Sequence, residues 1–300
     1  MKSITSKINF VDIHNPEYPN LLREIPNPPK KIYFLGELPA DKENDLPRVA
    51  IVGTRKATVA GKLMAKKISQ KLSEMGIIVV SGLAMGIDTA AHEGAILAGA
   101  KTIAVLANGL DSIYPRQNEN LAKRILELGG AIISEYPVDA PALPHQFLER
   151  NRIVSGLCAA TIVIEAPIES GALVTARLAA EQGREVFVFP GSADHPNFRG
   201  SHKLIRDGAR LVSSFEDIME DLSLEISNSQ FLISNKISNS QNIKDEKQLL
   251  IFNTIREAGG TLNIDKIIEL TKLEPQIANQ SVAIMVIEGT IKETERGYIL

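Results

Sequence analysis

Basic side chains follow several apolar runs of this 300-residue chain, each at the point where a buried strand would end. Arg55 comes directly after the first run, where helix N–H groups would bind an anion, and "FLERNR" brings an aromatic ring next to two arginines. One phosphate needs one or two cations, so a longer row with a ring among them predicts a groove for a single strand with a base stacked on Phe147. The candidate residues are Gly53, Thr54, Arg55, Arg116, Phe147, Arg150, Asn151, Arg152, Arg199 and Lys203.

Plainer interpretations exist for the same residues. Arg55 can be a surface arginine beside a turn, and Phe147 can be a core residue. Arg150 and Arg152 can form ion pairs with Glu135 and Glu165. We expect one of these two arginines to be structural and to hold its loop by such a pair.

Catalytic and cofactor signatures are weak or missing in this sequence. "GTRKATVAGKL" is neither a Walker A loop nor a G-x-G-x-x-G turn, and no nucleophile elbow or HExxH occurs. Asp88 and His92 lie one helical turn apart, but a metal site needs a third ligand. The sequence therefore predicts no catalytic residue, no metal and no cofactor.

The elements that must position the candidates alternate between strand and helix. The predicted strands are continuous apolar runs, as expected when both faces of a parallel sheet are covered. Alternation of this kind indicates a doubly wound α/β fold, in which ligands bind beyond the carboxyl ends of the strands. The strands are predicted at 48–53, 77–82, 102–107, 131–136, 161–166, 185–191 and 209–214, and the helices at 58–75, 87–99, 117–128, 145–158, 171–183 and 201–208.

Four segments are predicted along the chain. Residues 1–47 contain seven prolines and should wrap the main domain, with one short strand near "IYFLG". Residues 48–222 form that domain, and the Ser/Asn-rich stretch 223–244 reads as a flexible linker. Residues 245–300 predict three helices, the second capped by Asn263, and a β-ribbon, which together suggest a small winged-helix domain.

Composition places the chain among soluble globular proteins, with 44% hydrophobic and 23% charged residues. No apolar run reaches the length of a membrane helix, and no secretory signal is evident. The single cysteine, Cys158, fits a reducing cytoplasm. The net charge is −3, yet residues 48–215 carry +4 and residues 216–300 carry −6, so the predicted domain is the basic part.

Several long motifs in this order resemble the bacterial DNA-processing protein A family (DprA, also called Smf). They are "GTR", "SGLAMGIDTAAHEGAI", "TIAVLANGLDSIYPRQNENL", "FLERNRIVSGL", "SGALVTARLAAEQGREVFVFPG" and "GSHKLIRDGA". The resemblance implies an extended Rossmann-like fold that binds single-stranded DNA, often as a homodimer. It also implies protection of incoming DNA in natural transformation and loading of the RecA recombinase.

The resemblance also carries the candidate site. Arg55 matches the arginine of the family's Gly-Ser-Arg turn, with Thr54 in place of serine and the hydroxyl kept. Phe147 and the Arg150–Arg152 stretch match the loop and helix start that line the DNA pocket. Many members carry a helical domain before the sheet, and this chain starts too late for one.

The rival interpretation is an enzyme that hydrolyses nucleotides, because nucleoside-monophosphate phosphoribohydrolases look similar in strand order. Their P-G-G-x-G-T-x-x-E motif is absent, and "FPGSADHPNFRG" keeps only Pro190 and Gly191. The predicted third helix of the tail, 274–287, has no basic residue, so we expect the tail to contact protein or to regulate. The apolar residues around Leu211 and Phe215 are our expectation for a dimer face.

Overall fold

The computed structural model describes residues 8–38, 47–222, 246–258, 260–287, 291–294 and 297–299. The chain divides into two compact units, residues 1–223 and 224–300. The predicted linker, 223–244, lies outside the described residues. No helix among those residues combines the length and the apolar character that crossing a bilayer requires.

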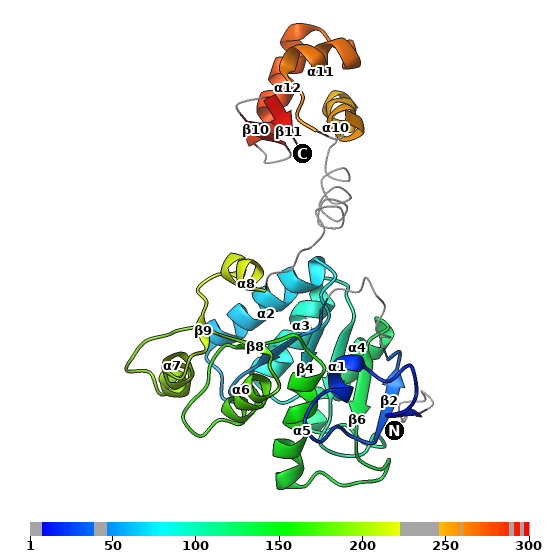
Figure 1. The fold of residues 1–300 in the computed structure, drawn as a ribbon, viewed down its shortest axis with the longest axis vertical. Coiled ribbons are helices and arrows are strands. Elements are labelled where there is room, and N and C mark those ends of the chain that lie inside the picture. Colours follow the sequence, from blue (N-terminus) through cyan, green and yellow to red (C-terminus); the bar gives the residue numbers. More distant parts are fainter. Residues whose placement is uncertain are drawn as a thin grey trace. The chain divides into compact units, whose positions relative to one another are not determined.

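The first unit is built on a nine-stranded sheet with the order β1-β2-β6-β5-β4-β3-β7-β8-β9 (Figure 1). The strands from β6 to β9 in that order run parallel, whereas β2 pairs antiparallel with β6 and with β1. All seven predicted strands are confirmed. The strands are β1 (Asn9–Asp12), β2 (Lys31–Gly36), β3 (Val49–Val52), β4 (Val79–Ser81), β5 (Thr102–Val105), β6 (Ala131–Ser134), β7 (Ala160–Val163), β8 (Glu185–Val188) and β9 (Arg210–Leu211).

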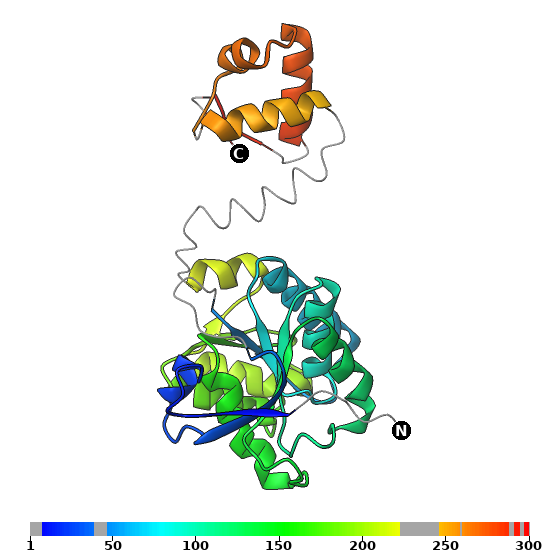
Figure 2. The ribbon, with the colours of Figure 1, turned by 90° about the vertical axis from the view of Figure 1, so that its right-hand side faces the viewer.

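Helices cover both faces of this sheet (Figure 2), because the buried strands are apolar on both sides. Ile133 belongs to a core cluster that includes residues of α1, α5, α6 and α7, whereas its neighbour Ile132 belongs to a second cluster with residues of α3 and α4. The doubly wound prediction is therefore confirmed. The helices are α1 (Asn20–Arg23), α2 (Val59–Glu74), α3 (Ile87–Leu97), α4 (Glu119–Glu127), α5 (Pro144–Gly156), α6 (Gly171–Glu181), α7 (Arg199–Arg206) and α8 (Phe215–Asp221), with 3-10 turns η1 (Arg116–Asn118) and η2 (Pro196–Phe198).

The proline-rich start of the chain holds more regular structure than the sequence predicted. Besides β2 it forms β1 and the short helix α1, which are fixed by the buried Tyr18. The hydroxyl of Tyr18 donates a hydrogen bond to the carbonyl of Pro29 over 2.7 Å. This hydrogen bond joins residues 11 positions apart, a contact that hydrophobic periodicity does not encode.

The order of the strands reverses at β3. From β3 the chain moves through β4 and β5 to β6 on one side, and then returns to β7 on the other side of β3. The loops after β3 and β7 therefore diverge, which opens a crevice at the carboxyl edge of the sheet. This is where a doubly wound fold binds its ligands.

The second unit contains the three predicted helices and the predicted ribbon. Their core includes Phe252, Ile267 and Met285. The side chain of Asn263 caps α11 by accepting a hydrogen bond from the Lys266 N–H, as predicted. The winged-helix assignment stays a prediction. The elements are α10 (Glu246–Ala258), α11 (Ile264–Thr271), α12 (Pro275–Ile287), β10 (Lys292–Thr294) and β11 (Gly297–Ile299).

Candidate nucleic-acid interface

A cavity of about 650 Å³ lies at the carboxyl ends of β3, β4 and β7, where the strand order reverses. Its wall combines the turn after β3, the start of α6 and one side of α5. It is lined by Val52, Gly53, Thr54, Arg55, Lys56, Gly82, Ala84, Asp88, Tyr114, Pro144, Phe147, Leu148, Arg150, Asn151, Val154, Pro167, Glu169, Ser170, Gly171, Ala172 and Thr175.

The turn after β3 is held tightly against its neighbours. A side chain at Gly53 would meet Ile87, because its Cβ would lie 2.5 Å from the Ile87 Cγ1. The Thr54 N–H donates to the Glu165 carbonyl over 2.7 Å, which joins the ends of β3 and β7. Arg55 follows with an exposed side chain. The backbone of the turn is thus fixed, and the cation that it carries faces solvent.

Arg55 and two aromatic rings meet at the wall of the cavity. The guanidinium carbon of Arg55 lies over the Phe147 ring, 5.2 Å from its centroid. The ring of Tyr114 contacts Phe147 edge-to-face, with centroids 5.4 Å apart and an interplanar angle of 61°. Phe147 is half-buried, whereas Tyr114 is exposed. This cluster joins a positive charge to π surface, which suits a phosphate beside a base.

Arg150 forms the floor of the cavity rather than an open cation. It is buried, and its Nη1 donates to the carbonyls of Gly82, over 2.8 Å, and Val105. Burial lowers the pKa of the guanidinium to about 10, and the charge of Asp88 acts in the opposite direction. The arginine therefore stays protonated near neutral pH and caps the ends of β4 and β5.

Asn151 links this floor to α6. Its Oδ1 accepts from the Arg150 Nε over 3.3 Å, and its Nδ2 donates to the Gly171 carbonyl over 3.2 Å. Ser170 precedes α6 and caps it, because its side chain accepts a hydrogen bond from the Ala172 N–H. The amino end of α6, which carries the partial positive charge of the helix dipole, consequently lines the cavity.

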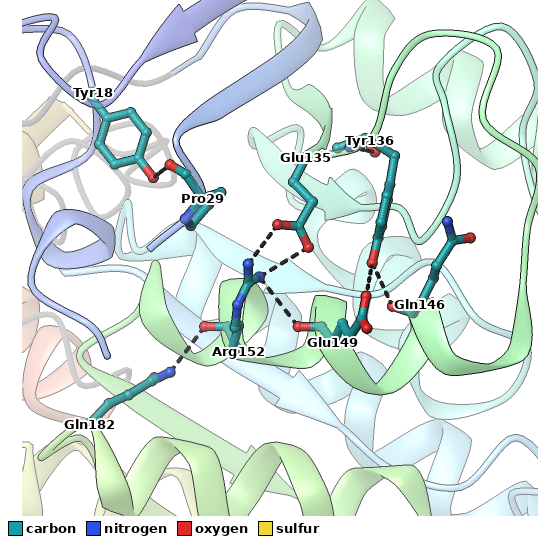
Figure 3. A network of polar contacts seen from close by, with 9 residues as sticks. Tyr18, Pro29, Glu135, Tyr136, Gln146, Glu149, Arg152 and Gln182 are labelled. Carbon is teal, nitrogen blue, oxygen red and sulfur yellow. Dashed lines mark hydrogen bonds and ion pairs between the residues drawn. The ribbon is translucent and has the colours of Figure 1, made fainter. Parts of the chain in front are cut away.

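Arg152 lies outside the cavity lining and forms an ion pair with Glu135 (Figure 3). Its Nη2 and Nη1 lie 2.6 and 3.1 Å from the two carboxylate oxygens. Gln182 donates to the Arg152 carbonyl over 3.1 Å, and the Tyr136 hydroxyl donates to Glu149 over 2.9 Å. Arg152 thus forms the ion pair that was expected of one of the two arginines, and Arg150 is structural as well.

Three further candidates also lie outside the cavity lining. Arg116 has a side chain that is 75% exposed, with its Nε 3.6 Å from a Glu119 carboxylate oxygen. Arg199 and Lys203 are exposed on α7. The structure thus gathers six predicted residues around the cavity, namely Gly53, Thr54, Arg55, Phe147, Arg150 and Asn151.

Tyr114 was not among the residues predicted from the sequence, and the helix start at residue 171 was predicted without its Ser170 cap. Ser170 before Gly171 is an N-cap signal that could have revealed this cap. Tyr114 had no comparable signal, because its contact with Phe147 joins a loop to the helix α5, far along the chain. Among the described residues, no group of three His, Cys, Asp or Glu side chains is placed to hold a metal ion.

The two ionisable residues of "GIDTAAH", Asp88 and His92, are buried in the protein. Asp88 accepts hydrogen bonds from the N–H groups of Gly82, over 3.1 Å, and Ala84, over 3.3 Å. His92 is fully buried, and burial lowers the pKa of its imidazole to about 3. Their proximity in sequence therefore reflects the packing of α3 beneath the cavity.

The open, mostly parallel sheet, with a cavity at its switch point lined by a helix amino end, defines a Rossmann-like α/β protein with an anion-compatible site. Residues 9–223 match the family model of DNA recombination-mediator protein A. The chain belongs to this family, and the resemblance found in the motifs is confirmed.

Relatives and solved structures agree with this assignment. The chain is 44% identical to protein Smf of Synechocystis over 71% of its own length and 54% of the relative. It is 39% identical to DNA processing protein DprA of Bacillus subtilis, over 72% of this chain and 71% of that one. The chain thus spans about half the length of the first relative and 71% of the length of the second.

Two solved structures share the fold. DprA from Streptococcus pneumoniae superposes with a TM-score of 0.65 at 40% identity, covering 71% of this chain and 74% of that one. DNA processing protein A from Helicobacter pylori gives 0.64 at 29% identity, covering 74% and 98%. The H. pylori protein binds single-stranded DNA.

Proposed function

We propose that this chain binds single-stranded DNA at the carboxyl-edge cavity and serves DNA recombination. The observation that carries the proposal is the stacked pair of Arg55 and Phe147 at the wall of that cavity. An exposed cation on a fixed turn suits a phosphate, and the adjacent aromatic surface suits a base. Membership of the recombination-mediator family and the DNA binding of the H. pylori relative support the same function.

The six residues around the cavity divide into two roles in this proposal. Arg55 contacts the strand, and Phe147 supplies aromatic surface. Gly53, Thr54, Arg150 and Asn151 shape and hold the wall through their backbone and side-chain contacts. Arg116, Arg199 and Lys203 are exposed outside the lining and take the phosphates of a longer strand.

The partners that we propose are those that membership of the family implies. The chain hands its DNA to the RecA recombinase, protects incoming DNA in natural transformation and acts as a homodimer in the cytoplasm. Leu211, 51% exposed on the edge strand β9, supports a dimer face at the last strands. Mass measurement with and without a dT oligomer tests self-association and strand binding together.

A binding function without catalysis is part of the proposal. Of the acids that line the cavity, Asp88 is bound to two backbone N–H groups and Glu169 is exposed. Arg150, the buried arginine of the cavity lining, is bound to two carbonyls. Asp88 and Arg150 thus serve the wall, whereas the rival nucleotide hydrolase would have to use Glu169 as its acid.

Equilibrium binding to a fluorescent dT oligomer at several salt concentrations tests the function. We expect affinity to fall steeply with salt and duplex of the same length to compete poorly. Turnover of AMP with weak oligomer binding would instead support the rival hydrolase. Assembly of RecA on DNA coated with single-strand-binding protein, with and without the chain, tests the proposed handover.

For the second unit we propose a regulatory or protein-contact role. Residues 245–300 hold more acidic than basic residues, and α12 carries no basic residue. A helix that reads duplex DNA needs basic side chains to meet phosphates. Salt-dependent binding of duplex DNA by the fragment 244–300 would contradict this role.

A further inference from the structure

Helix α2 turns apolar and basic side chains to solvent on one of its sides. Its other side packs on α3, where a Cβ at Gly94 would lie 2.3 Å from the Lys66 carbonyl oxygen. On the open side Val59 is 77% exposed and Leu63 is 62% exposed. Along this segment the lining of the carboxyl-edge cavity ends at Lys56. The open side of α2 is therefore a surface separate from the cavity.

Four side chains spaced four residues apart form a row along this side of the helix. They are Val59, Leu63, Lys67 and Lys71. Lys62 precedes Leu63 directly and is also exposed. Among the described residues, the ammonium groups of Lys62 and Lys67 have no acidic partner. The row thus combines two exposed apolar side chains with unpaired positive charge.

Lys71, at the end of the row, shows what such a lysine binds. Its Nζ lies 4.9 Å from the centroid of the Phe215 ring and 3.0 Å from a Glu216 carboxylate oxygen. Both partners belong to α8, which carries four acids among its seven residues and lies beside the end of α2 (Figure 1). A cation held between a carboxylate and an aromatic ring gains from both contacts. The remainder of the row has the same chemistry without such a partner.

We propose that Val59, Leu63 and Lys67, with Lys62 beside them, form a docking surface for an acidic amphipathic segment of a partner protein. The acids of that segment pair with Lys62 and Lys67, and its apolar side chains cover Val59 and Leu63. A phosphate backbone fits this surface less well, because it would leave the two apolar side chains in water. Apolar contact at the centre and charge at the rim are the usual composition of a protein interface.

NMR of the full-length chain with labelled Val and Leu methyl groups tests the docking surface. The probe is an acetylated and amidated peptide of residues 214–222, "SFEDIMEDL", which reproduces the chemistry of α8. We expect it to shift the methyl signals of Val59 and Leu63 and to leave those of the buried Leu72 unchanged. The matched control is the same peptide with lysine at its four acidic positions, which should not bind.

Three variants separate the contributions to this binding. Leu63→Ser should weaken peptide binding by about 5-fold or more, because an apolar contact at the centre is lost. Lys67→Glu should weaken it too and should gain binding of the lysine peptide, a reversal that a damaged fold cannot produce. Lys71→Met removes the lysine that α8 already occupies and should leave peptide binding unchanged. Circular dichroism of each variant verifies the fold.

Other results would overturn the docking surface. One is the absence of any peptide-induced shift at Val59 and Leu63. Another is a set of shifts centred on Lys71 and lost in Lys71→Met, because the peptide would then only replace α8. Neither result bears on the proposed DNA binding, which depends on the cavity.

Two further results would give the surface a different occupant and so contradict the proposal. A dT oligomer that shifts the methyl signals of Val59 and Leu63, and that binds Lys67→Glu more weakly than wild type, would assign the surface to DNA. Self-association of the wild-type chain that Leu63→Ser abolishes would assign it to a second copy. Analytical ultracentrifugation of both proteins measures that association.

Discussion

Arg150 and Arg152 lie two positions apart on α5 and point to different sides of that helix. Arg150 donates a hydrogen bond to the Gly82 carbonyl at the cavity floor, and Arg152 forms an ion pair with the Glu135 carboxylate outside the cavity. Two helical positions correspond to about 200° of rotation, so one helix can close the cavity and fasten itself to the loop after β6. Neither arginine is free, which leaves Arg55 as the cavity's exposed guanidinium among the described residues.

Arg152→Met should destabilise the protein and leave DNA affinity nearly unchanged. Breaking a buried ion pair costs about 3–5 kcal/mol, and the side chains of Arg152 and Glu135 are still 16% and 15% exposed. We therefore expect the free energy of unfolding to fall by about 2 kcal/mol, measured by urea denaturation. Arg177→Met, at an exposed position of α6, is the matched control and should be near neutral.

Arg150→Met should destabilise the first unit more strongly. It leaves the Gly82 and Val105 carbonyls without their donor in a buried place, at about 1–3 kcal/mol each. Arg150→Lys keeps a charge and a donor and should recover part of the loss. A denaturation midpoint of Arg150→Met equal to that of wild type would show that these carbonyls do not need the guanidinium.

Arg55→Ala should weaken DNA binding and flatten its salt dependence. One lost phosphate contact reduces the slope of log K against log salt by about 0.7 for a single strand. Phe147→Ala should weaken binding and leave the slope nearly unchanged, because the ring carries no charge. Equal slopes for the two variants would contradict the assigned roles, and Lys62→Ala, exposed on α2 outside the cavity lining, is the control.

Glu165→Gln should loosen the wall of the cavity. The buried carboxylate accepts from the Thr58 N–H over 3.0 Å, from the Thr58 hydroxyl and from the Asn197 Nδ2 over 2.9 Å. A glutamine replaces one acceptor oxygen by a donor facing those donors, so unfolding free energy should fall by about 1–3 kcal/mol. Glu169→Gln, the same change at an exposed position, should have little effect on urea denaturation.

His92 should remain neutral well below the pH at which ordinary imidazoles protonate. Its Nδ1 lies 2.9 Å from the Thr102 hydroxyl oxygen, which itself donates to the Val79 carbonyl, so Nδ1 carries the proton and Nε2 has no partner. Burial first, and Arg150 second, lower the pKa to about 3. Two-dimensional NMR of the histidine rings checks this, with the exposed His145 as reference.

The low pKa of His92 also makes the stability of the folded protein depend on pH. The unfolded chain takes up this proton near pH 6.5 and the folded chain only near pH 3, so the group's stabilising contribution is lost as pH falls through that window. The loss approaches about 1.4 kcal/mol per pH unit. Asp88, whose pKa burial raises, acts in the opposite direction, so the ring titration is the cleaner measurement. A His92 resonance that titrates near pH 6.5 would contradict the buried, unpartnered nitrogen.

Much of the fold was predictable from local patterns in the sequence. Continuous apolar runs such as 102–107 and 161–166 marked strands buried on both faces, and parallel strands bring their carboxyl ends to one edge. The placement of Gly53 and Arg55 at that edge follows from that rule. The short strand β1 was missed because four residues, one of them exposed, carry no clear period.

What the sequence determined by itself was thus the list of elements and the edge at which the polar loops gather, because hydrophobic periodicity is a local property of the chain. Only the tertiary structure decided which side chains are free. The partners of Arg150, Arg152 and Tyr114 lie 17 or more residues away in sequence, at Gly82, Glu135 and Phe147. Burial and pairing depend on such distant neighbours, and they separate an arginine that holds the wall from one that can meet a phosphate.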